Sequence, residues 1–335
     1  MVVPSHSEEI TVMGGGSWGA TMAQYLSTLG HSVTVWHRNV EELRVMAEER
    51  THPFIPDLKF SPSVGFTSDL SSLRPSRMVF IAVPSHGVRE LVRRLTIIHE
   101  NTVVINLAKG IENETLLRMS QVITEVAPVS ESNVATLSGP SHAEEVARKV
   151  PTAVVVAGTD TRTIESIQKA ISSEVFRVYA NTDSVGVELA GSVKNVSAMA
   201  AGVCDGIGLG DNTKAALITR GIVEITRLGV AMGAKAETIA GLSGMGDLLV
   251  TCLSQYSRNR YVGEQIGRGG KLSKVLKEMR MVAEGVRTTE SVSALSEKYR
   301  VDMPICTAVH GVLFGGEDPR EAVKRLMTRE LVYEG

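Results

Sequence analysis

The chain has 335 residues, which suits about two domains with a sizeable core. Its 35 basic and 37 acidic residues nearly balance and form no long basic run, so bulk charge gives no support for a nucleic-acid-binding protein. The 3 cysteines are odd in number and far apart, which argues against a disulfide framework and a zinc site with closely spaced ligands and favours a reducing compartment.

The pattern of apolar residues also argues against a membrane protein. No uncharged apolar stretch reaches the roughly 20 residues that span a bilayer. Residues 1–10 have neither a cationic start nor an apolar h-region. We therefore expect a cytoplasmic protein with no membrane span, no metal site and no nucleic-acid partner.

The first elements in chain order are a strand, a glycine-rich turn and a helix. Residues 10–13 are a short apolar run, residues 20–29 have helical spacing of apolar side chains, and residues 31–36 supply a second strand. The glycines between the first strand and the helix fit G-x-G-x-x-G, in which a tight turn brings a pyrophosphate close to a helix N-terminus. These glycines are Gly14, Gly16 and Gly19.

The residues after the second strand bear on the choice of cofactor. Sites selective for NAD usually carry an acidic residue about 20 positions after the glycines, whereas this chain has His37 and Arg38. An arginine there can face a ribose 2′-phosphate, although an arginine stacked on adenine would tolerate either cofactor. We expect NADPH, with NADH left open.

Five further apolar runs read as strands, with helical stretches between most of them. They are residues 78–83, 102–106, 134–137, 153–157 and 175–179. The alternation predicts an α/β N-terminal part with a Rossmann-type doubly wound parallel sheet. Ligands of such sheets collect beyond the carboxyl ends of the strands.

Several polar residues follow these strands. Lys109 is a cation at a strand end, well placed for a negatively charged ligand. Residues Ser141 to Glu144 have the sequence pattern of a capping box. For His86 and His142 we prefer ordinary roles in helix capping and turns over a catalytic role.

The second half of the chain is predicted to be all-α. We therefore expect a dinucleotide-binding Rossmann domain over 1–183 and a helical substrate-binding and catalytic domain over 184–335. Lys194 is the only cation in the apolar helix expected over 185–203. A buried amine has a lowered pKa and can exchange protons. The alternative, that Lys194 pairs with Glu188 or extends to the surface, stays open at this point.

A second informative stretch covers residues 241–260. Glycines surround Asp247, and Ser257, Arg258 and Asn259 offer a hydroxyl, a guanidinium and an amide to one oxyanion. The alternative is a helix N-cap at Ser257 followed by solvated arginines.

Seven motifs in this order resemble the bacterial NAD(P)-dependent glycerol-3-phosphate dehydrogenases over nearly the whole chain. They begin at Gly14 (GGGSWG), Asn106 (NLAKG), Ser138 (SGPSHA), Gly186 (GVE), Lys194 (KN), Gly244 (GMGD) and Ser257 (SRN). Gly15 stands where the family has an alanine, and this extra glycine is expected to loosen the loop.

The resemblance implies reversible reduction of dihydroxyacetone phosphate to sn-glycerol 3-phosphate, the backbone precursor of phospholipids, by a homodimer. Lys194 would be the general acid and base, and Lys109 and Asp247 would flank the reacting carbonyl. The substrate would be bound by Lys109, Gly139, Ser141, Asn195, Asp247, Thr251, Ser257, Arg258 and Asn259. The cofactor would be bound by Gly14, Gly16, Ser17, Trp18, Gly19, His37, Arg38, Lys109, Ala143, Arg258, Val282 and Glu284.

Two other functions remain to be weighed against this one. A reductase with the same two-domain plan could act on a 2-keto or 3-oxo acid, because a carboxylate also fits an Arg-Asn pocket. A cofactor-sensing regulator could retain the nucleotide fold without the chemistry, but it would have no need of Lys194, Lys109 and Asp247.

Overall fold

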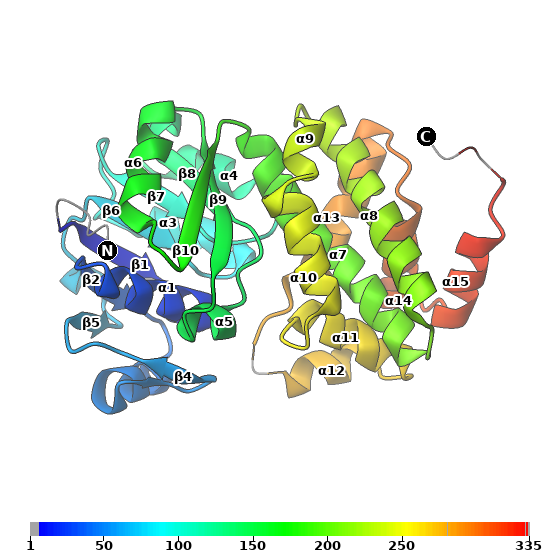
Figure 1. The fold of residues 1–335 in the computed structure, drawn as a ribbon, viewed down its shortest axis with the longest axis horizontal. Helices are drawn as coiled ribbons and strands as arrows, with labels where there is room; N and C mark the ends of the chain where they lie inside the picture. Colours follow the sequence, from blue (N-terminus) through cyan, green and yellow to red (C-terminus); the bar gives the residue numbers. More distant parts are fainter. Residues whose placement is uncertain (1–6, 280, 332, 334–335) are drawn as a thin grey trace.

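The computed structural model describes residues 7–279, 281–331 and 333. Figure 1 shows a sheet flanked by helices, formed by the first half of the chain, beside a bundle of helices formed by the second half. The expectation about residues 1–6 at the start of the chain lies outside the described residues.

Eight strands form the main sheet, in the order β10-β9-β8-β7-β6-β1-β2-β5. Their bounds are β1 (Glu9–Met13), β2 (Ser32–Trp36), β5 (Val64–Thr67), β6 (Met78–Ile81), β7 (Val103–Asn106), β8 (Val134–Ser138), β9 (Thr152–Gly158) and β10 (Phe176–Asn181). All seven strands expected from the sequence are present. The sequence did not predict β5 or the hairpin of β3 (Thr51–His52) and β4 (Ile55–Lys59), because Gly65 and Pro56 interrupt their short apolar patterns.

The sheet is mostly parallel, as expected, and contains one antiparallel pair that was not predicted. Strands β8 and β9 pair antiparallel, while the other neighbouring pairs of the described sheet are parallel. The connection from β8 to β9 contains only the short helix α5 (Ala143–Ala147), which packs against α1 and β4. Strand β9 therefore begins at the same end of the sheet where β8 finishes. A parallel pair would require the chain to cross to the opposite end first.

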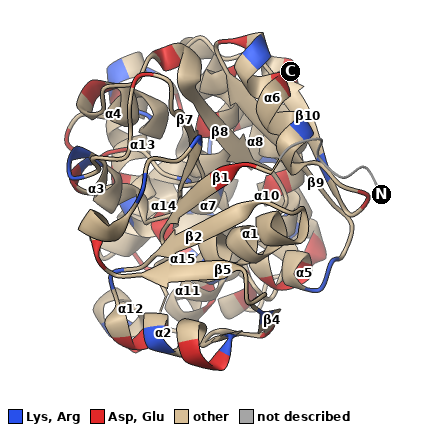
Figure 2. Ribbon diagram, turned by 90° about the vertical axis from the view of Figure 1, so that its left-hand side faces the viewer, with Lys and Arg blue, Asp and Glu red and all other residues tan. Residues whose placement is uncertain are grey.

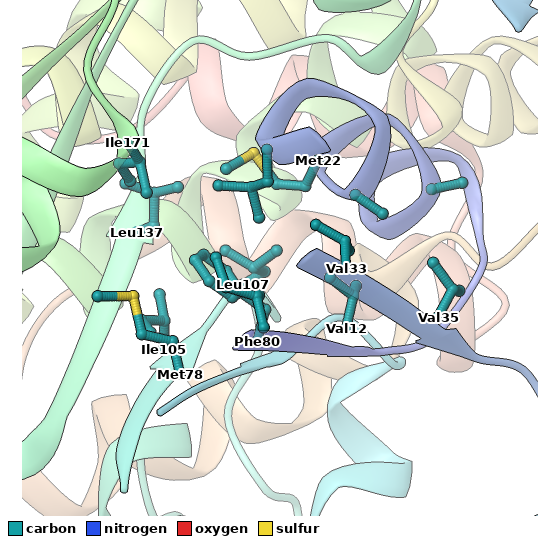
Figure 3. Packing of buried hydrophobic residues seen from close by; sticks show 14 of the residues in the cluster. Val12, Met22, Val33, Val35, Met78, Phe80, Ile105, Leu107, Leu137 and Ile171 are labelled. Carbon is teal, nitrogen blue, oxygen red and sulfur yellow. The ribbon is translucent and has the colours of Figure 1, made fainter. Parts of the chain in front are cut away.

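Helices cover both faces of the sheet. One face is covered by α1 (Ser17–Thr28), α5 and α6 (Thr161–Ile171), and the other by α3 (Val88–Arg93) and α4 (Met119–Val126). Figure 3 shows the first face, where Met22 of α1 packs over Val12 and Val33. Alternate strand residues such as Val79 and Ile81 point into the second core. Each fully buried side chain of this kind stabilises the fold by about 1.5–3 kcal/mol.

The second half is built around α7 (Ser184–Gly206), whose residues 186–204 are all buried. The other helices are α8 (Asp211–Ala231), α9 (Ala236–Ile239), α10 (Asp247–Leu253), α11 (Arg258–Gly267), α12 (Leu272–Glu278), α13 (Glu284–Tyr299), α14 (Pro304–Phe314) and α15 (Pro319–Met327). Helices α7 and α11 touch backbone to backbone, since a Cβ on Gly202 would lie 1.9 Å from the Arg260 carbonyl oxygen. Among the described residues, no helix combines the length and apolar character needed to cross a bilayer.

Charges are mixed on the side of the molecule shown in Figure 2. Basic and acidic segments are interspersed there, and α2 (Val40–Arg44) with the turn that continues it carries both signs. This distribution matches the nearly balanced composition.

Candidate active site

The glycine-rich turn between β1 and α1 has the shape that a dinucleotide phosphate requires. Gly14 has φ +123°, and a Cβ there would lie 2.6 Å from the Ala82 carbonyl oxygen. A Cβ on Gly19 would lie 2.0 Å from the carbonyl oxygen of Gly14. In contrast, a Cβ on Gly16 would meet no described atom within 4 Å beyond its chain neighbours, and no described side chain caps α1. The N-terminus of α1 is thus open to an anion, which the helix dipole favours.

The two residues after β2 differ in their surroundings. His37 accepts a hydrogen bond from Gly15 N at 3.1 Å through Nδ1, and its Nε2 lies 2.9 Å from Glu42 Oε2. Arg38 is exposed and makes no hydrogen bond or ion pair with a described residue. Arg38 is therefore free to bind a phosphate or an adenine ring, whereas His37 supports the turn.

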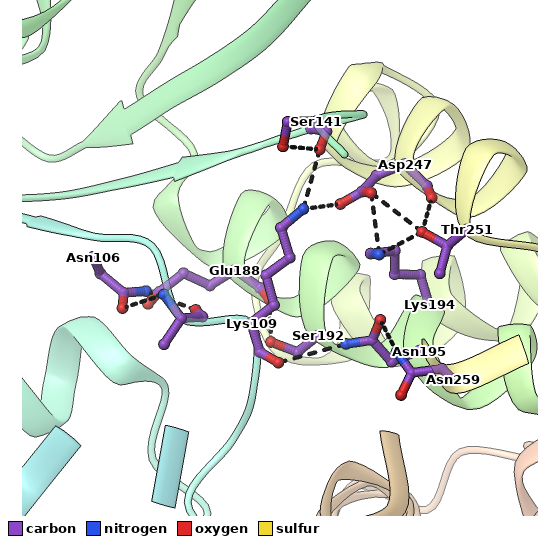
Figure 4. Close-up of polar contacts among 12 residues, drawn as sticks. Asn106, Lys109, Ser141, Glu188, Ser192, Lys194, Asn195, Asp247, Thr251 and Asn259 are labelled. Carbon is purple, nitrogen blue, oxygen red and sulfur yellow. Dashed lines mark hydrogen bonds and ion pairs between the residues drawn. The ribbon is translucent and has the colours of Figure 1, made fainter. Parts of the chain in front are cut away.

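Two lysines from distant parts of the chain share one carboxylate (Figure 4). Lys109 Nζ lies 2.6 Å from Asp247 Oδ2, and Lys194 Nζ lies 3.1 Å from Asp247 Oδ1. Lys194 also donates to Thr251 Oγ1 at 2.6 Å, and this hydroxyl donates to the Asp247 carbonyl oxygen. Asp247 and Thr251 lie one turn apart on α10, so one helix positions both partners of Lys194.

Lys194 is 4% exposed, and its desolvation has an electrostatic consequence. Burial lowers the pKa of the Lys194 amine to about 8, although the Asp247 carboxylate opposes this shift. The Lys109 charge adds to the lowering. An amine with this pKa can both donate and accept a proton near neutral pH.

The alternative that Lys194 pairs with Glu188 is wrong. Glu188 is buried beside Arg118, forms an ion pair with its guanidinium, and accepts hydrogen bonds from Ser120 N at 2.8 Å and Ser120 Oγ at 2.6 Å. Lys194 lies six positions further along α7 and contacts Asp247 and Thr251 of α10 instead. The surface alternative fails as well, because the Lys194 side chain is only 5% exposed.

The asparagine pair next to this cluster is largely engaged within the protein. Asn259 Nδ2 donates to Asn195 Oδ1 at 2.9 Å, and Asn259 Oδ1 accepts from Gly285 N at 2.9 Å. Asn195 Nδ2 lies 3.5 Å from the Lys109 carbonyl oxygen. One amide hydrogen of Asn259 has no acceptor among the described residues and is left for a ligand.

Arg258 and Ser257 begin helix α11. The Ser257 side chain accepts from Arg260 N at 3.2 Å, so the N-cap alternative is confirmed for this hydroxyl. Arg258 is reached by solvent and has no hydrogen bond or ion pair with a described residue. The protein atoms around it nevertheless displace enough water to lower the pKa of its guanidinium. A cation that is accessible yet surrounded by protein is suited to a bound anion.

The turn after β8 differs from the expected capping box. Ser141 Oγ donates to the Gly139 carbonyl oxygen at 3.0 Å, and this oxygen also accepts from Lys109 Nζ at 3.0 Å. Helix α5 begins after His142 with no side-chain cap, so the capping interpretation is wrong. The reason is that the Gly139 carbonyl, held at φ +135°, lies within reach of the hydroxyl. Ala143 is the first, buried residue of α5.

Two buried polar atoms near the lysines have no hydrogen-bond partner among the described residues: Ser138 Oγ and His142 Nε2. Burial and then the charge on Lys194 lower the pKa of His142 to about 4, so this imidazole is neutral at physiological pH. The expected ordinary capping role of His142 is not observed.

Helix α13 brings its first residue to the sheet. Glu284 accepts hydrogen bonds from Ser85 N at 2.9 Å and from Ser85 Oγ at 2.5 Å, across 199 positions of sequence. Val282 is 40% exposed, and the neighbouring Met281 sulfur accepts a hydrogen bond from Ser17 Oγ at 3.2 Å. The segment before α13 therefore lies against the glycine-rich turn. Ser85 as the partner of Glu284 was not predicted, because nothing in the sequence links two positions so far apart.

The structure brings the expected catalytic residue Lys194 and the expected substrate residues into one hydrogen-bonded cluster; the latter are Lys109, Gly139, Ser141, Asp247 and Thr251. Asn195 joins it through the Lys109 carbonyl, and Asn259 joins through Asn195. Of the expected cofactor residues at the glycine-rich turn, Ser17 donates a hydrogen bond to Met281 in the segment before α13, and Arg38 forms no hydrogen bond or ion pair with a described residue.

Known proteins resemble the chain along its length. Residues 9–164 match the NAD-dependent glycerol-3-phosphate dehydrogenase N-terminus, and residues 183–324 match the corresponding C-terminus. The glycerol-3-phosphate dehydrogenase (NAD(P)+) of Thermoanaerobacter sp. (strain X514) is 48% identical over 328 residues, covering 97% of this chain and 98% of the relative. A second such enzyme, from Salinibacter ruber, is 50% identical and covers 98% of this chain and 96% of its own.

A solved structure agrees with these sequence matches. The crystal structure of glycerol-3-phosphate dehydrogenase from Coxiella burnetii has a TM-score of 0.91 and 35% identity, and covers 96% of this chain and 99% of that one. The resemblance seen in the seven motifs is confirmed. The chain therefore belongs to the family of NAD(P)-dependent glycerol-3-phosphate dehydrogenases, oxidoreductases with NAD(P)H as coenzyme.

Proposed function

We propose that the protein reversibly reduces dihydroxyacetone phosphate to sn-glycerol 3-phosphate, with Lys194 as the proton donor. The observation that carries this proposal is the buried cluster in which Lys194 shares the Asp247 carboxylate with Lys109. A cofactor-sensing protein would have no use for two lysines on one buried carboxylate. Such a cluster is costly to bury and is suited to proton transfer.

The proton-transfer step follows from the hydrogen bonds of Lys194. When bound, NAD(P)H supplies the hydride. Two of the three ammonium hydrogens of Lys194 are directed to Thr251 and Asp247. The third is available to a carbonyl oxygen, and its transfer converts the nascent alkoxide into the hydroxyl of the product. In the reverse direction the neutral amine removes the proton of that hydroxyl.

Lys109 and Asp247 set the electrostatics of this step. The Lys109 ammonium lies next to the carboxylate and stabilises negative charge that develops on the substrate oxygen. Asp247 holds both ammonium groups in place and keeps Lys194 protonated more readily than burial alone would allow. The Lys109 ammonium also donates a hydrogen bond to the Gly139 carbonyl oxygen, which further restricts its orientation.

The substrate phosphate is assigned to the start of α11. Arg258 has an accessible guanidinium without a hydrogen-bond or ion-pair partner among the described residues, and one amide hydrogen of Asn259 has no acceptor among them. Ser257 donates its hydroxyl hydrogen to the same anion, since its oxygen already accepts from Arg260 N. Hydrogen bonds to a charged group contribute about 1.5–3 kcal/mol each.

The cofactor is assigned to the turn between β1 and α1. The open position at Gly16 and the uncapped N-terminus of α1 suit the pyrophosphate, with Ser17, Trp18 and Ala143 beside it. Arg38, exposed and unpaired with any described residue, suits the 2′-phosphate of NADPH and supports NADPH over NADH. Val282 and Glu284 complete the site from the helical half.

The proposal also covers the domain boundary, the cellular compartment and the oligomeric state. The division at residues 183 and 184 is supported by β10 ending at Asn181 and α7 beginning at Ser184. The three cysteines are free and buried, in keeping with a reducing cytoplasm. We further assign the protein to a homodimer that supplies the glycerol backbone of phospholipids.

An assay of NADPH and NADH oxidation tests this function. Dihydroxyacetone phosphate, unphosphorylated dihydroxyacetone and a panel of keto acids are offered with each cofactor. We expect turnover of the phosphate ester with a higher kcat/KM for NADPH, and very poor turnover of dihydroxyacetone, because remote binding energy is used at the reacting carbon. Equal rates with and without the phosphate would contradict the Arg258 assignment, and turnover of a keto acid alone would contradict the substrate.

A further inference from the structure

Two imidazoles hold both polar groups of one residue in the cofactor turn. Gly15 N donates to His37 Nδ1 at 3.1 Å, and the Gly15 carbonyl oxygen lies 3.2 Å from His52 Nε2. His37 follows β2, while His52 ends β3, in the hairpin that the sequence did not predict. Gly15 is therefore fixed from two separate elements.

The second nitrogen of each ring determines its tautomer. His52 Nδ1 accepts a hydrogen bond from Phe54 N at 3.2 Å, so Nε2 carries the proton and donates to Gly15. His37 Nδ1 accepts from Gly15 N, so its Nε2 carries the proton and donates to Glu42. A proton on Nδ1 of His52 would face the backbone N–H of Phe54, so the His52 ring is neutral in this arrangement.

The surroundings of His52 favour this neutral form. Its side chain is 3% exposed, and burial lowers the pKa of the imidazole. The hydrogen bond to the Gly15 carbonyl and the charge of Glu42 oppose this lowering of the pKa. At neutral pH the donor to Gly15 is thus in place.

The glycine at position 15 gives these contacts their importance. A Cβ there would lie 2.9 Å from Met46 Cε and 3.1 Å from His37 Cβ, so a side chain at this position would displace the flexible end of Met46 and press on His37. A turn of three successive glycines is entropically costly to order. The expected loosening by the extra glycine is opposed by hydrogen bonds to both peptide groups of Gly15.

We infer that His52 is a positioning residue of the cofactor site, which orders the Gly14 to Gly16 turn through the Gly15 carbonyl before the dinucleotide binds. The inference rests on the proposed function, since it assigns the cofactor pyrophosphate to this turn. His52 itself touches no phosphate. It acts by lowering the conformational cost of binding, so its loss weakens cofactor affinity with little effect on turnover.

Two amide substitutions, each of which mimics one ring nitrogen of His52, distinguish the contributions of its two hydrogen bonds. In His52→Gln the amide nitrogen takes the position of Nε2 and still donates to the Gly15 carbonyl. In His52→Asn the amide oxygen takes the position of Nδ1, still accepts from Phe54 N, and loses the donor to Gly15. The two variants therefore serve as matched controls for each other.

The readouts are the Kd of NADPH, measured by fluorescence titration without substrate, the KM and kcat of the reduction, and the Tm of the free protein. For His52→Asn we expect Kd and KM for NADPH to rise roughly 3- to 10-fold, as for the loss of one hydrogen bond, with kcat nearly unchanged. For His52→Gln we expect values near those of the parent. Equal effects in both variants, or losses of affinity that follow Tm alone, would overturn the inference.

The same measurements separate this inference from the proposed function. If the parent binds NADPH but does not reduce dihydroxyacetone phosphate, the proposed substrate is wrong and the His52 comparison still stands on Kd. If the parent is active and both variants bind NADPH as it does, only the role of His52 is wrong.

Imidazole nitrogen shifts of the 15N-histidine-labelled parent test the inference without any variant, should His52→Asn fail to fold. We expect His52 to be neutral with the proton on Nε2 at about neutral pH. A proton on Nδ1 or a charged ring would overturn the inference.

Discussion

At the scale of single residues, the decisive arrangement is three charges within one hydrogen-bonded group. Lys194 and Lys109 repel each other, and Asp247 is the one counter-charge that pairs with both within the described part of the chain. Removal of any one of these three charged groups therefore changes the proton affinity of the other two. This coupling leads to two predictions.

The first prediction concerns pH. The pKa of Lys194 is lowered to about 8, and the proposed function makes the protonated amine the proton donor for reduction. We expect kcat/KM for reduction to be constant at lower pH and to fall as pH rises through about 8, and kcat/KM for the oxidation of glycerol 3-phosphate to rise over the same range.

Asp247→Asn is the matched variant for this measurement. It removes the carboxylate that raises the Lys194 pKa, so the inflection should move to lower pH along with a large loss of kcat. An inflection that stays in place in the variant would contradict the coupling of Lys194 to Asp247.

The second prediction concerns Lys194→Ala. Loss of a positioned general acid lowers kcat by about 10²- to 10⁴-fold. The Kd of NADPH should stay near that of the parent, since Lys194 contacts α10 rather than the glycine-rich turn. Steady-state rates and a fluorescence titration check both parts, and near-normal turnover would remove Lys194 from the mechanism.

At the scale of elements, the crossing of α7 and α11 sets where these residues lie. A Cβ on Gly263 of α11 would lie 2.0 Å from the Met199 carbonyl oxygen of α7. Lys194 and Asn195 lie on α7, and Asn259 lies on α11. A shift of one helix along the other would separate the two asparagines.

Gly263→Ala tests this close contact. The added methyl group must push two backbones apart, which should destabilise the protein by about 1–3 kcal/mol in urea unfolding. The control is Gly87→Ala, where a Cβ meets nothing within 4 Å and φ is −100°. Its free energy of unfolding should stay within about 0.5 kcal/mol of the parent. Equal costs in the two variants would contradict the account of the crossing.

At the scale of the whole molecule, a buried ion pair connects the sheet to the helical half. Glu188 of α7 and Arg118 before α4 are each largely buried, and Ser120 at the start of α4 supplies two further hydrogen bonds. Together with the Ser85–Glu284 contact, this pair fixes how α7 approaches the strand ends.

Substitution of the pair gives a prediction at this scale. Arg118→Leu leaves the Glu188 carboxylate buried without its counter-charge and should cost about 3–5 kcal/mol of unfolding free energy. The double variant Arg118→Leu, Glu188→Leu should be less destabilised than Arg118→Leu, because no uncompensated charge remains. Urea unfolding of the parent and the variants measures the difference, and a double variant less stable than the single would contradict it.

The sequence by itself determined the features with local signals. The glycine turn, the seven apolar strands and the long apolar α7 were predicted from spacing alone, since each depends on neighbouring residues. The resemblance also identified the residues of the lysine cluster, because these residue types occur within recognisable motifs.

Only the tertiary structure decided which charges meet. Lys194 and Glu188 lie six positions apart on one helix, yet Lys194 pairs with Asp247 of α10, and Glu188 pairs with Arg118 before α4. The antiparallel β9, the Ser85–Glu284 contact and the support of Gly15 by His52 were likewise absent from the sequence patterns. Each depends on the packing of segments far apart in the chain, where partners are selected by burial and geometry and not by the spacing of residues along the sequence.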